Sequence, residues 1–91
     1  MTPPYRETVF FSGHVQGVGF RYAALQVARE FEVAGKVSNL ADGRVELDVE
    51  GSRDEVFGYI AAVEERMHGY IRKTERVRSN VPGNHQGFVI G

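Results

Sequence analysis

Residues 44–50 carry the pattern that most restricts the fold of this chain. Within this segment Val45, Leu47 and Val49 alternate strictly with charged residues. Successive side chains of an extended strand point to opposite faces, so the apolar side chains lie on one face and the charged ones on the other. The charged residues are Arg44, Glu46, Asp48 and Glu50. The segment therefore predicts a strand in a sheet that has one packed face and one face open to water.

Two other segments have the periodicity of amphipathic helices. The first covers about residues 21–32, where apolar residues recur at intervals of three and four positions. These residues are Ala24, Val27, Ala28 and Phe31. The second begins at Ser52 and is expected to end at residues 68–69, because Ser52 and Glu55 have the spacing of a capping box, in which each side chain accepts from the other residue's amide. Its apolar stripe consists of Val56, Ile60, Val63 and Met67.

Four further segments predict strands because they are rich in β-branched and aromatic residues. They cover residues 7–13, 33–40, 74–81 and 87–90. Asp42 and Gly43 give residues 41–43 the chemistry of a tight hairpin turn. The order βαββαβ predicts an α+β protein with a two-layer ferredoxin-like sandwich, in which an antiparallel sheet carries two helices on one face.

Length and composition limit the possible functions. A chain of 91 residues is long enough for one small domain, and we expect a single domain over residues 1–91 with residues 1–5 disordered. The absence of cysteine excludes a disulfide framework and a thiol nucleophile, and it is compatible with a reducing compartment. A formal net charge of -1 provides no global positive field to hold nucleic acid or a membrane. The longest apolar run, residues 59–63, is too short to span a bilayer, and we expect a cytoplasmic monomer.

The chemistry is expected in the glycine-rich loop between the first strand and the first helix. Its glycines allow backbone N–H groups to approach a ligand, and the first amides of a helix are unpaired and carry partial positive charge. Arg21 adds a guanidinium fork that suits phosphate or carboxylate. The loop lacks the Lys-Ser/Thr of a P-loop and the third glycine of a dinucleotide fingerprint. An anion site is therefore favoured over nucleotide binding, and a loop that merely connects strand and helix is the plainer alternative.

This loop resembles the signature of the acylphosphatases. Its sequence is Gly13-His14-Val15-Gln16-Gly17-Val18-Gly19-Phe20-Arg21. A second block is similar to the second signature of that family, and a third near residue 90 extends the similarity over nearly the whole chain. These blocks are Gly35-Lys36-Val37-Ser38-Asn39 with Asp42-Gly43-Arg44-Val45-Glu46, and Gly87-Phe88-Val89-Ile90. The chain differs from the family at Lys36, Ser38 and Gly91, where aromatic, basic and polar or aromatic residues respectively are more usual.

The resemblance implies hydrolysis of the carboxyl-phosphate bond of acyl phosphates to a carboxylate and inorganic phosphate, without a metal or other cofactor. Arg21 matches the phosphate-binding arginine of the family, and Asn39 matches the asparagine that positions the attacking water. The implied phosphate cradle consists of the amides of Val15, Gln16, Gly17, Val18, Gly19 and Phe20. Phosphoryl transfer depends mainly on positioning and charge stabilisation, so amides, one arginine and an oriented water form a plausible set. The expected partner is a small acyl phosphate.

Other candidates have weaker support from the residues. The three histidines, His14, His68 and His85, lack the spacing of metal ligands and are expected at the surface or as caps. The basic residues within 72–78 favour nucleic acid, but residues 44–50 offer neither aromatic side chains for stacking nor a positive field. No nucleic-acid partner is therefore expected. The alternative to an enzyme is a non-catalytic α+β module that senses an anion or serves as an interaction surface.

Overall fold

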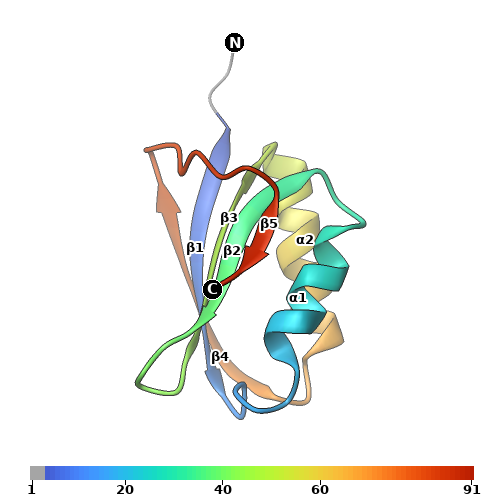
Figure 1. Ribbon diagram of the computed structural model, residues 1–91, viewed down its shortest axis with the longest axis vertical. Coiled ribbons are helices and arrows are strands. Elements are labelled where there is room, and N and C mark those ends of the chain that lie inside the picture. The colour runs from blue at the N-terminus through green and yellow to red at the C-terminus, as the bar shows by residue number, and fades with distance from the viewer. Residues whose placement is uncertain (1–3) are drawn as a thin grey trace.

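The computed structural model describes residues 4–91 of the chain. Within these residues a five-stranded sheet carries two helices on one of its faces (Figure 1). The elements in chain order are β1 (Tyr5–Gly13), α1 (Phe20–Ala28), β2 (Val33–Asn39), β3 (Val45–Gly51), α2 (Arg53–Arg66), β4 (Ile71–Ser79) and β5 (Phe88–Ile90). The predicted α+β sandwich, with both helices in one layer, is confirmed.

The sheet has the strand order β4-β1-β3-β2-β5. Its four long strands are antiparallel, and Val37 of β2 lies opposite Leu47 of β3. The fifth strand corrects the prediction of a purely antiparallel sheet, because β5 pairs in parallel with β2, with Val89 opposite Lys36. After β4 the chain passes from one edge of the sheet to the other before it enters β5 (Figure 1). This long return lets the last strand run in the same direction as β2.

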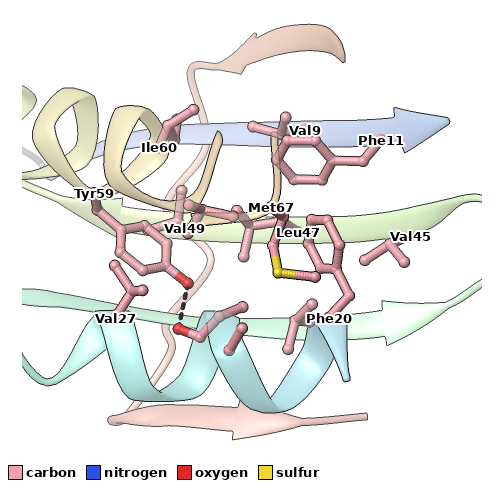
Figure 2. Packing of buried hydrophobic residues seen from close by; sticks show 14 of the residues in the cluster. Val9, Phe11, Phe20, Val27, Val45, Leu47, Val49, Tyr59, Ile60 and Met67 are labelled. Atoms are coloured by element: carbon pink, nitrogen blue, oxygen red, sulfur yellow. Dashed lines mark hydrogen bonds between the residues drawn. The ribbon is translucent and has the colours of Figure 1, made fainter. Parts of the chain in front are cut away.

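The core lies between the sheet and the helices (Figure 2). The apolar side of residues 44–50 is confirmed, because its three side chains are fully buried. The predicted stripe on α2 is also buried; its members are Val56, Ile60, Val63 and Met67. The hydroxyl of Tyr59 donates a hydrogen bond of 2.8 Å to the carbonyl oxygen of Ala24, which ties α2 to α1 (Figure 2). Burial raises the pKa of Tyr59 far above its ordinary value, so its hydroxyl stays a neutral donor.

Helix α1 is shorter than its periodicity predicts, because it ends at Ala28 rather than near residue 32. The amides of Arg29, Glu30 and Phe31 donate to carbonyl oxygens three residues earlier. Such spacing belongs to tight 3₁₀-type turns, which end the regular helix before the chain reverses into β2. Phe31 nevertheless packs against the core, as its place in the apolar pattern requires.

The start of α2 matches only half of the predicted capping box. The Ser52 hydroxyl accepts a hydrogen bond of 3.2 Å from the amide of Glu55, as expected. The Glu55 carboxylate does not return to Ser52 and instead accepts a hydrogen bond of 2.7 Å from the amide of Glu32. This contact fastens the turn after α1 to the start of α2. The other end of α2 is capped by Met67, one residue before the predicted stop.

The sheet face opposite the helices is covered in part, which corrects the prediction that the charged side of β3 is open to water. Glu50 is only 6% exposed, because the segment between β4 and β5 lies against it. The amides of Gly83 and His85 donate hydrogen bonds of 2.9 and 2.6 Å to the Glu50 carboxylate. Asp48 accepts two hydrogen bonds of 2.8 Å from the Arg6 guanidinium, and its Oδ2 lies 3.0 Å from Nε2 of His85. Charged residues on this face therefore anchor the returning chain.

Strand β1 begins at Tyr5, which corrects the prediction of disorder for that residue, while residues 1–3 lie outside the described part of the chain. The Tyr5 ring packs edge-on against Phe57 of α2, with 5.5 Å between ring centroids. Strand β4 covers Ile71–Ser79 rather than the predicted residues 74–81. One member of its basic cluster, Arg76, forms a bidentate ion pair with Glu7, whose side chain is 3% exposed.

Candidate active site

The loop between β1 and α1 lies at the same end of the molecule as the hairpin between β2 and β3 (Figure 1). Gly17 and Gly19 in this loop have left-handed backbone conformations, with φ of 79° and 78°, which residues with a Cβ atom rarely adopt. Gly19 is also the N-cap of α1, and as a glycine it has no side chain that could cap the helix. The loop therefore leads into an uncapped helix start, which attracts anions.

The loop amides themselves are free of backbone partners. Within residues 4–91, none of the amides of residues 15–20 donates a hydrogen bond to a backbone carbonyl. Backbone donors in folded proteins are nearly always paired, and those that are not are satisfied by water or ligands. The row of unpaired N–H groups thus provides several donors for one negatively charged ligand.

The side chain of Gln16 holds the loop in position. Its Nε2 donates hydrogen bonds to the carbonyl oxygens of Leu40, at 2.8 Å, and of Arg44, at 3.0 Å. On the other side of the loop, the amide of His14 donates a hydrogen bond of 2.9 Å to the carbonyl oxygen of Tyr70. The loop is thereby tied to the hairpin between β2 and β3 and to the turn before β4.

A cavity of about 230 Å³ opens beside this loop. It is formed by three parts of the chain, namely the loop with the first turn of α1, the end of β2 and the end of β5. The lining residues are Val15, Gly17, Gly19, Phe20, Arg21, Tyr22, Asn39 and Ile90. Arg21 and Asn39, which belong to separate sequence motifs, therefore share one cavity.

Most residues of the predicted site line this cavity, but two do not. Gln16 bonds to the hairpin instead, and the side chain of Val18 packs against the core, so these residues can contribute only their amides. Tyr22 and Ile90 line the cavity although the sequence reasoning does not select them. Tyr22 directly follows Arg21 in the sequence, and this adjacency could have indicated that Tyr22 lies near the site. Ile90 reaches the cavity through the parallel pairing of β5 with β2, which no local pattern reveals.

The Arg21 guanidinium contacts the last residue of the chain. Its Nη1 donates a hydrogen bond of 3.2 Å to the main-chain oxygen of Gly91. Among residues 4–91 no Asp or Glu side chain forms an ion pair with Arg21. Gly91, Lys36 and Ser38, the residues at which the chain differs from the family pattern, lie together. A Cβ atom at Gly91 would overlap the Lys36 side chain and lie 2.6 Å from Oγ of Ser38.

The electrostatics of the cavity are simple. Of the described residues that line it, only Arg21 is charged, and none is Asp, Glu or His. His14 does not line the cavity, and its ring lies 6.4 Å from the ring of Tyr70, measured between centroids. In the described part of the chain, no group of three or more His, Cys, Asp or Glu side chains is placed to hold a metal ion. The arrangement can bind one anion and position a water molecule beside it.

A second and larger hollow, of about 780 Å³, lies at the opposite end of β1. Two arginines line it, Arg53 and Arg78, and their guanidinium carbons lie 6.0 and 5.1 Å from the centroid of the Tyr5 ring. No described residue of either sequence motif lines this hollow. The smaller cavity is therefore the better candidate site, because it combines free amides, an arginine that pairs with no Asp or Glu side chain of the described residues, and an asparagine.

Comparison with known proteins identifies the family. The model of the acylphosphatase family matches residues 7–90. The chain belongs to the acylphosphatase family. An acylphosphatase of Roseiflexus sp. (strain RS-1) is 57% identical over 86 residues, which cover 93% of this chain and 92% of that relative. An acylphosphatase of Corynebacterium glutamicum is 43% identical over 88 residues, covering 92% of this chain and 94% of the relative.

The acylphosphatase fold is shared as well. The crystal structure of the acylphosphatase from Bacillus subtilis superposes on this chain with a TM-score of 0.86 at 29% identity. The superposition covers 96% of this chain and 98% of that one. The resemblance of the motifs is thus confirmed as membership of the family. Over residues 4–91, no helix has the length and apolar character needed to cross a membrane.

Proposed function

We propose that this chain is an acylphosphatase that hydrolyses small acyl phosphates to a carboxylate and inorganic phosphate. Its family and its named relatives support this activity. The structural observation that carries the proposal is one cavity in which unpaired loop amides, Arg21 and Asn39 meet. These groups match the needs of phosphoryl transfer, which are positioning and stabilisation of negative charge.

In this proposal the phosphate group is held by the amides of residues 15–20 and by the guanidinium of Arg21. The positive end of the α1 dipole adds to the field of the unpaired N–H groups. The guanidinium fork can donate two parallel hydrogen bonds to phosphate oxygens. Because these donors are already fixed by the loop and the helix, they need little reorganisation when charge shifts onto the phosphoryl oxygens in the transition state.

Asn39 orients the attacking water in the proposed reaction. Its backbone is held at the end of β2, opposite Val45 of β3, and its side chain is exposed at the cavity. A side-chain amide does not accept a proton at neutral pH. Its oxygen can instead accept a hydrogen bond from the water and direct a lone pair of the water toward phosphorus.

The proton of the water passes to an oxygen of the substrate phosphate. None of the described residues that line the cavity is an Asp, Glu or His that could take it. The bond from water oxygen to phosphorus forms as the bond from phosphorus to the acyl oxygen breaks, and the proton remains on inorganic phosphate. The carboxylate leaves without strong general-acid help because it is weakly basic. A bell-shaped pH profile that disappears in His14→Ala would instead identify His14 as the base.

We further propose that the protein acts as a cytoplasmic monomer whose single domain spans residues 1–91. The lack of cysteine suits a reducing compartment. The edge strand β4 carries exposed basic side chains, which oppose edge-to-edge pairing with a second copy. These side chains include Arg72, Lys73 and Arg78. Size-exclusion chromatography with light scattering measures the oligomeric state directly, and a stable dimer would contradict the proposal.

Steady-state hydrolysis of acetyl phosphate and of p-nitrophenyl phosphate tests the activity. The acyl phosphate should be hydrolysed and the unactivated ester should not. Arg21→Ala should lose phosphate binding and turnover, whereas Asn39→Ala should still bind phosphate and lose about 10²-fold in kcat. Arg29→Ala, at the other end of α1, and Asn80→Ala, after β4, are matched controls on exposed residues and should retain activity.

The same measurements separate the enzyme from a non-catalytic anion sensor. A sensor would be stabilised by inorganic phosphate, with a higher melting temperature, but would hydrolyse neither substrate. Full hydrolysis by Asn39→Ala would contradict the role of Asn39 in positioning water. If Arg29→Ala lost as much activity as Arg21→Ala, charge on α1 in general would matter rather than Arg21.

A further inference from the structure

The larger hollow gathers positive charge that the proposed reaction does not use. It lies at the end of the molecule away from the loop between β1 and α1, where β1 begins, α2 begins and β4 ends (Figure 1). Of the described residues that line it, two are arginines, Arg53 and Arg78, and none is Asp or Glu. The chain as a whole has a formal net charge of -1. The hollow is therefore a local region of positive potential on a protein that is nearly neutral overall.

Strand pairing brings the two arginines together from distant parts of the sequence. Tyr5 of β1 lies opposite Gly51 of β3, and Arg53 follows two residues later as the first residue of α2. Arg78 of β4 lies opposite Glu7 of β1, so it shares a sheet face with Glu7 and with Tyr5. The guanidinium carbons of Arg53 and Arg78 lie 6.0 and 5.1 Å from the centroid of the Tyr5 ring. Their separation is therefore at most about 11 Å.

Neither charge is neutralised by an ion pair with a described residue. Within residues 4–91, no Asp or Glu side chain forms an ion pair with Arg53 or Arg78. The carboxylate of Glu7, on the same face, accepts two hydrogen bonds from Arg76, at 2.7 and 2.6 Å, and one of 2.7 Å from the Tyr5 hydroxyl. Packing against an aromatic ring supplies no acceptor for the N–H groups in the plane of a guanidinium. An anionic ligand would supply it.

Two nearby guanidinium groups suit a ligand with two linked phosphate groups. Each planar fork can donate two parallel hydrogen bonds of about 2.8 Å to phosphate oxygens. A diphosphate can place one phosphate group against each arginine, whereas a single phosphate has to satisfy both from one centre. The hollow, of about 780 Å³, has the size of ordinary small-molecule sites, which span about 300–1,000 Å³. Pro4 and Tyr5 give it apolar surface beside the arginines, with room for an organic group.

We propose that the larger hollow binds a diphosphate group, either free or carried by an organic molecule such as a nucleotide, through Arg53 and Arg78. Binding depends on these two side chains, because the nearby hydroxyls are already used. Ser52 accepts a hydrogen bond as the cap of α2, and the Ser79 hydroxyl bonds to the main chain of Val81. The site is separate from the candidate active site and does not depend on the proposed function.

Isothermal titration with inorganic pyrophosphate, without divalent cations, tests the site in an Arg21→Ala background. That substitution removes the phosphate binding expected beside α1, and one equivalent of pyrophosphate should still bind. In this background Arg53→Gln or Arg78→Gln should weaken binding about tenfold, the effect of one lost charge-assisted contact, and the two together should abolish it. Arg66→Gln in α2 and Arg72→Gln in β4 are matched controls, because neither residue lines the described part of the hollow. Both should bind as the background does.

Comparison of ligands tests the diphosphate itself. Inorganic phosphate should bind at least tenfold more weakly than pyrophosphate, and equal affinities would contradict a contact shared by two arginines. Tighter binding of ADP than of pyrophosphate would assign the apolar surface beside Tyr5 to an organic group, and equal binding would assign the site to the free diphosphate. Absence of pyrophosphate binding in the Arg21→Ala background would overturn the proposal.

Two further readouts keep the test independent of activity and of any one variant. In the parent protein, pyrophosphate should shift the amide NMR resonances of Gly51 and Asn80, and unchanged resonances there would overturn the site. An equal loss of affinity in Arg72→Gln and Arg78→Gln would show that only general charge matters, and would overturn it as well. With Arg21 intact, Arg53→Gln and Arg78→Gln should hydrolyse acetyl phosphate as the parent does. Failure of the parent to hydrolyse it would refute the proposed function and leave this site standing.

Discussion

Replacing Gln16 by methionine should destabilise the protein and weaken phosphate binding, although the Gln16 side chain does not line the cavity. Methionine has a similar length but no hydrogen-bond donor. It removes both bonds from Nε2 of Gln16 to the carbonyl oxygens of Leu40 and Arg44. The loop then loses its attachment to the hairpin between β2 and β3, while its backbone amides remain present.

The size of the effect follows from the two bonds that are lost. Each contributes about 0.5–1.5 kcal/mol net to folding. The two acceptor oxygens keep other partners, since the amides of Gly43 and Leu40 donate to them at 3.1 and 2.8 Å. We therefore expect a loss of about 1–2 kcal/mol, which lowers the melting temperature of a domain of this size by roughly 5–15 °C. If the free energy that favours the ordered loop falls by about 1 kcal/mol, phosphate affinity falls about fivefold.

Thermal unfolding followed by circular dichroism, with and without inorganic phosphate, measures both effects. Gln26→Met is the matched control, because Gln26 makes one exposed hydrogen bond, with Arg66, and its loss should change stability by less than about 0.5 kcal/mol. Gln16→Glu should be worse than Gln16→Met, since an ionised carboxylate would face two carbonyl oxygens. Equal melting temperatures for Gln16→Met and the parent would refute the idea that this side chain holds the loop.

Two further predictions concern the scaffold. Burial favours a raised pKa for Glu7, but hydrogen bonds from Arg76 and a neighbouring tyrosine outweigh it and lower the pKa, so the stability that the pair contributes above about pH 4.3 is lost as pH falls through the lowered value. Glu7→Gln should therefore lower the free energy of unfolding by about 1–3 kcal/mol at pH 7. As pH falls, its melting temperature should drop less steeply than that of the parent protein. An equally steep drop in both proteins would contradict the contribution of the Glu7–Arg76 pair. Gly13→Ala should lower the free energy of unfolding in urea by about 2 kcal/mol or more, because φ is 125° and a Cβ atom would lie 2.6 Å from the carbonyl oxygen of Tyr70. Gly43→Ala is its control, with φ of 97° but open space around it, and an equal loss in both variants would show that the close contact is unimportant.

The elements that the sequence predicts well are those whose neighbours in the chain decide their environment. In residues 44–50 and in α2, the spacing of apolar residues indicates which side chains are buried, and those side chains form the core. The Ser52 cap is equally local, since its partner is three residues away. Periodicity succeeds here because each element must bury one continuous face.

The predictions that fail depend on partners far along the chain. Glu55 has the right spacing to accept a hydrogen bond from the amide of Ser52. Its carboxylate instead accepts one from the amide of Glu32. Glu50 alternates as an exposed residue should, yet the segment near Gly83 covers it. The parallel direction of β5 follows from the same returning segment. Local patterns carry no information about which distant segment will supply a hydrogen-bond partner.

The two motifs, the order of the elements and the apolar faces follow from the sequence by itself, because local backbone preferences and side-chain spacing determine them. The tertiary structure alone decides that Arg21 and Asn39 share a cavity with Ile90. It also decides that Gln16 turns from the ligand site to the hairpin. These contacts join segments that are distant in sequence, and they form only when the strands pair and the helices pack against the sheet.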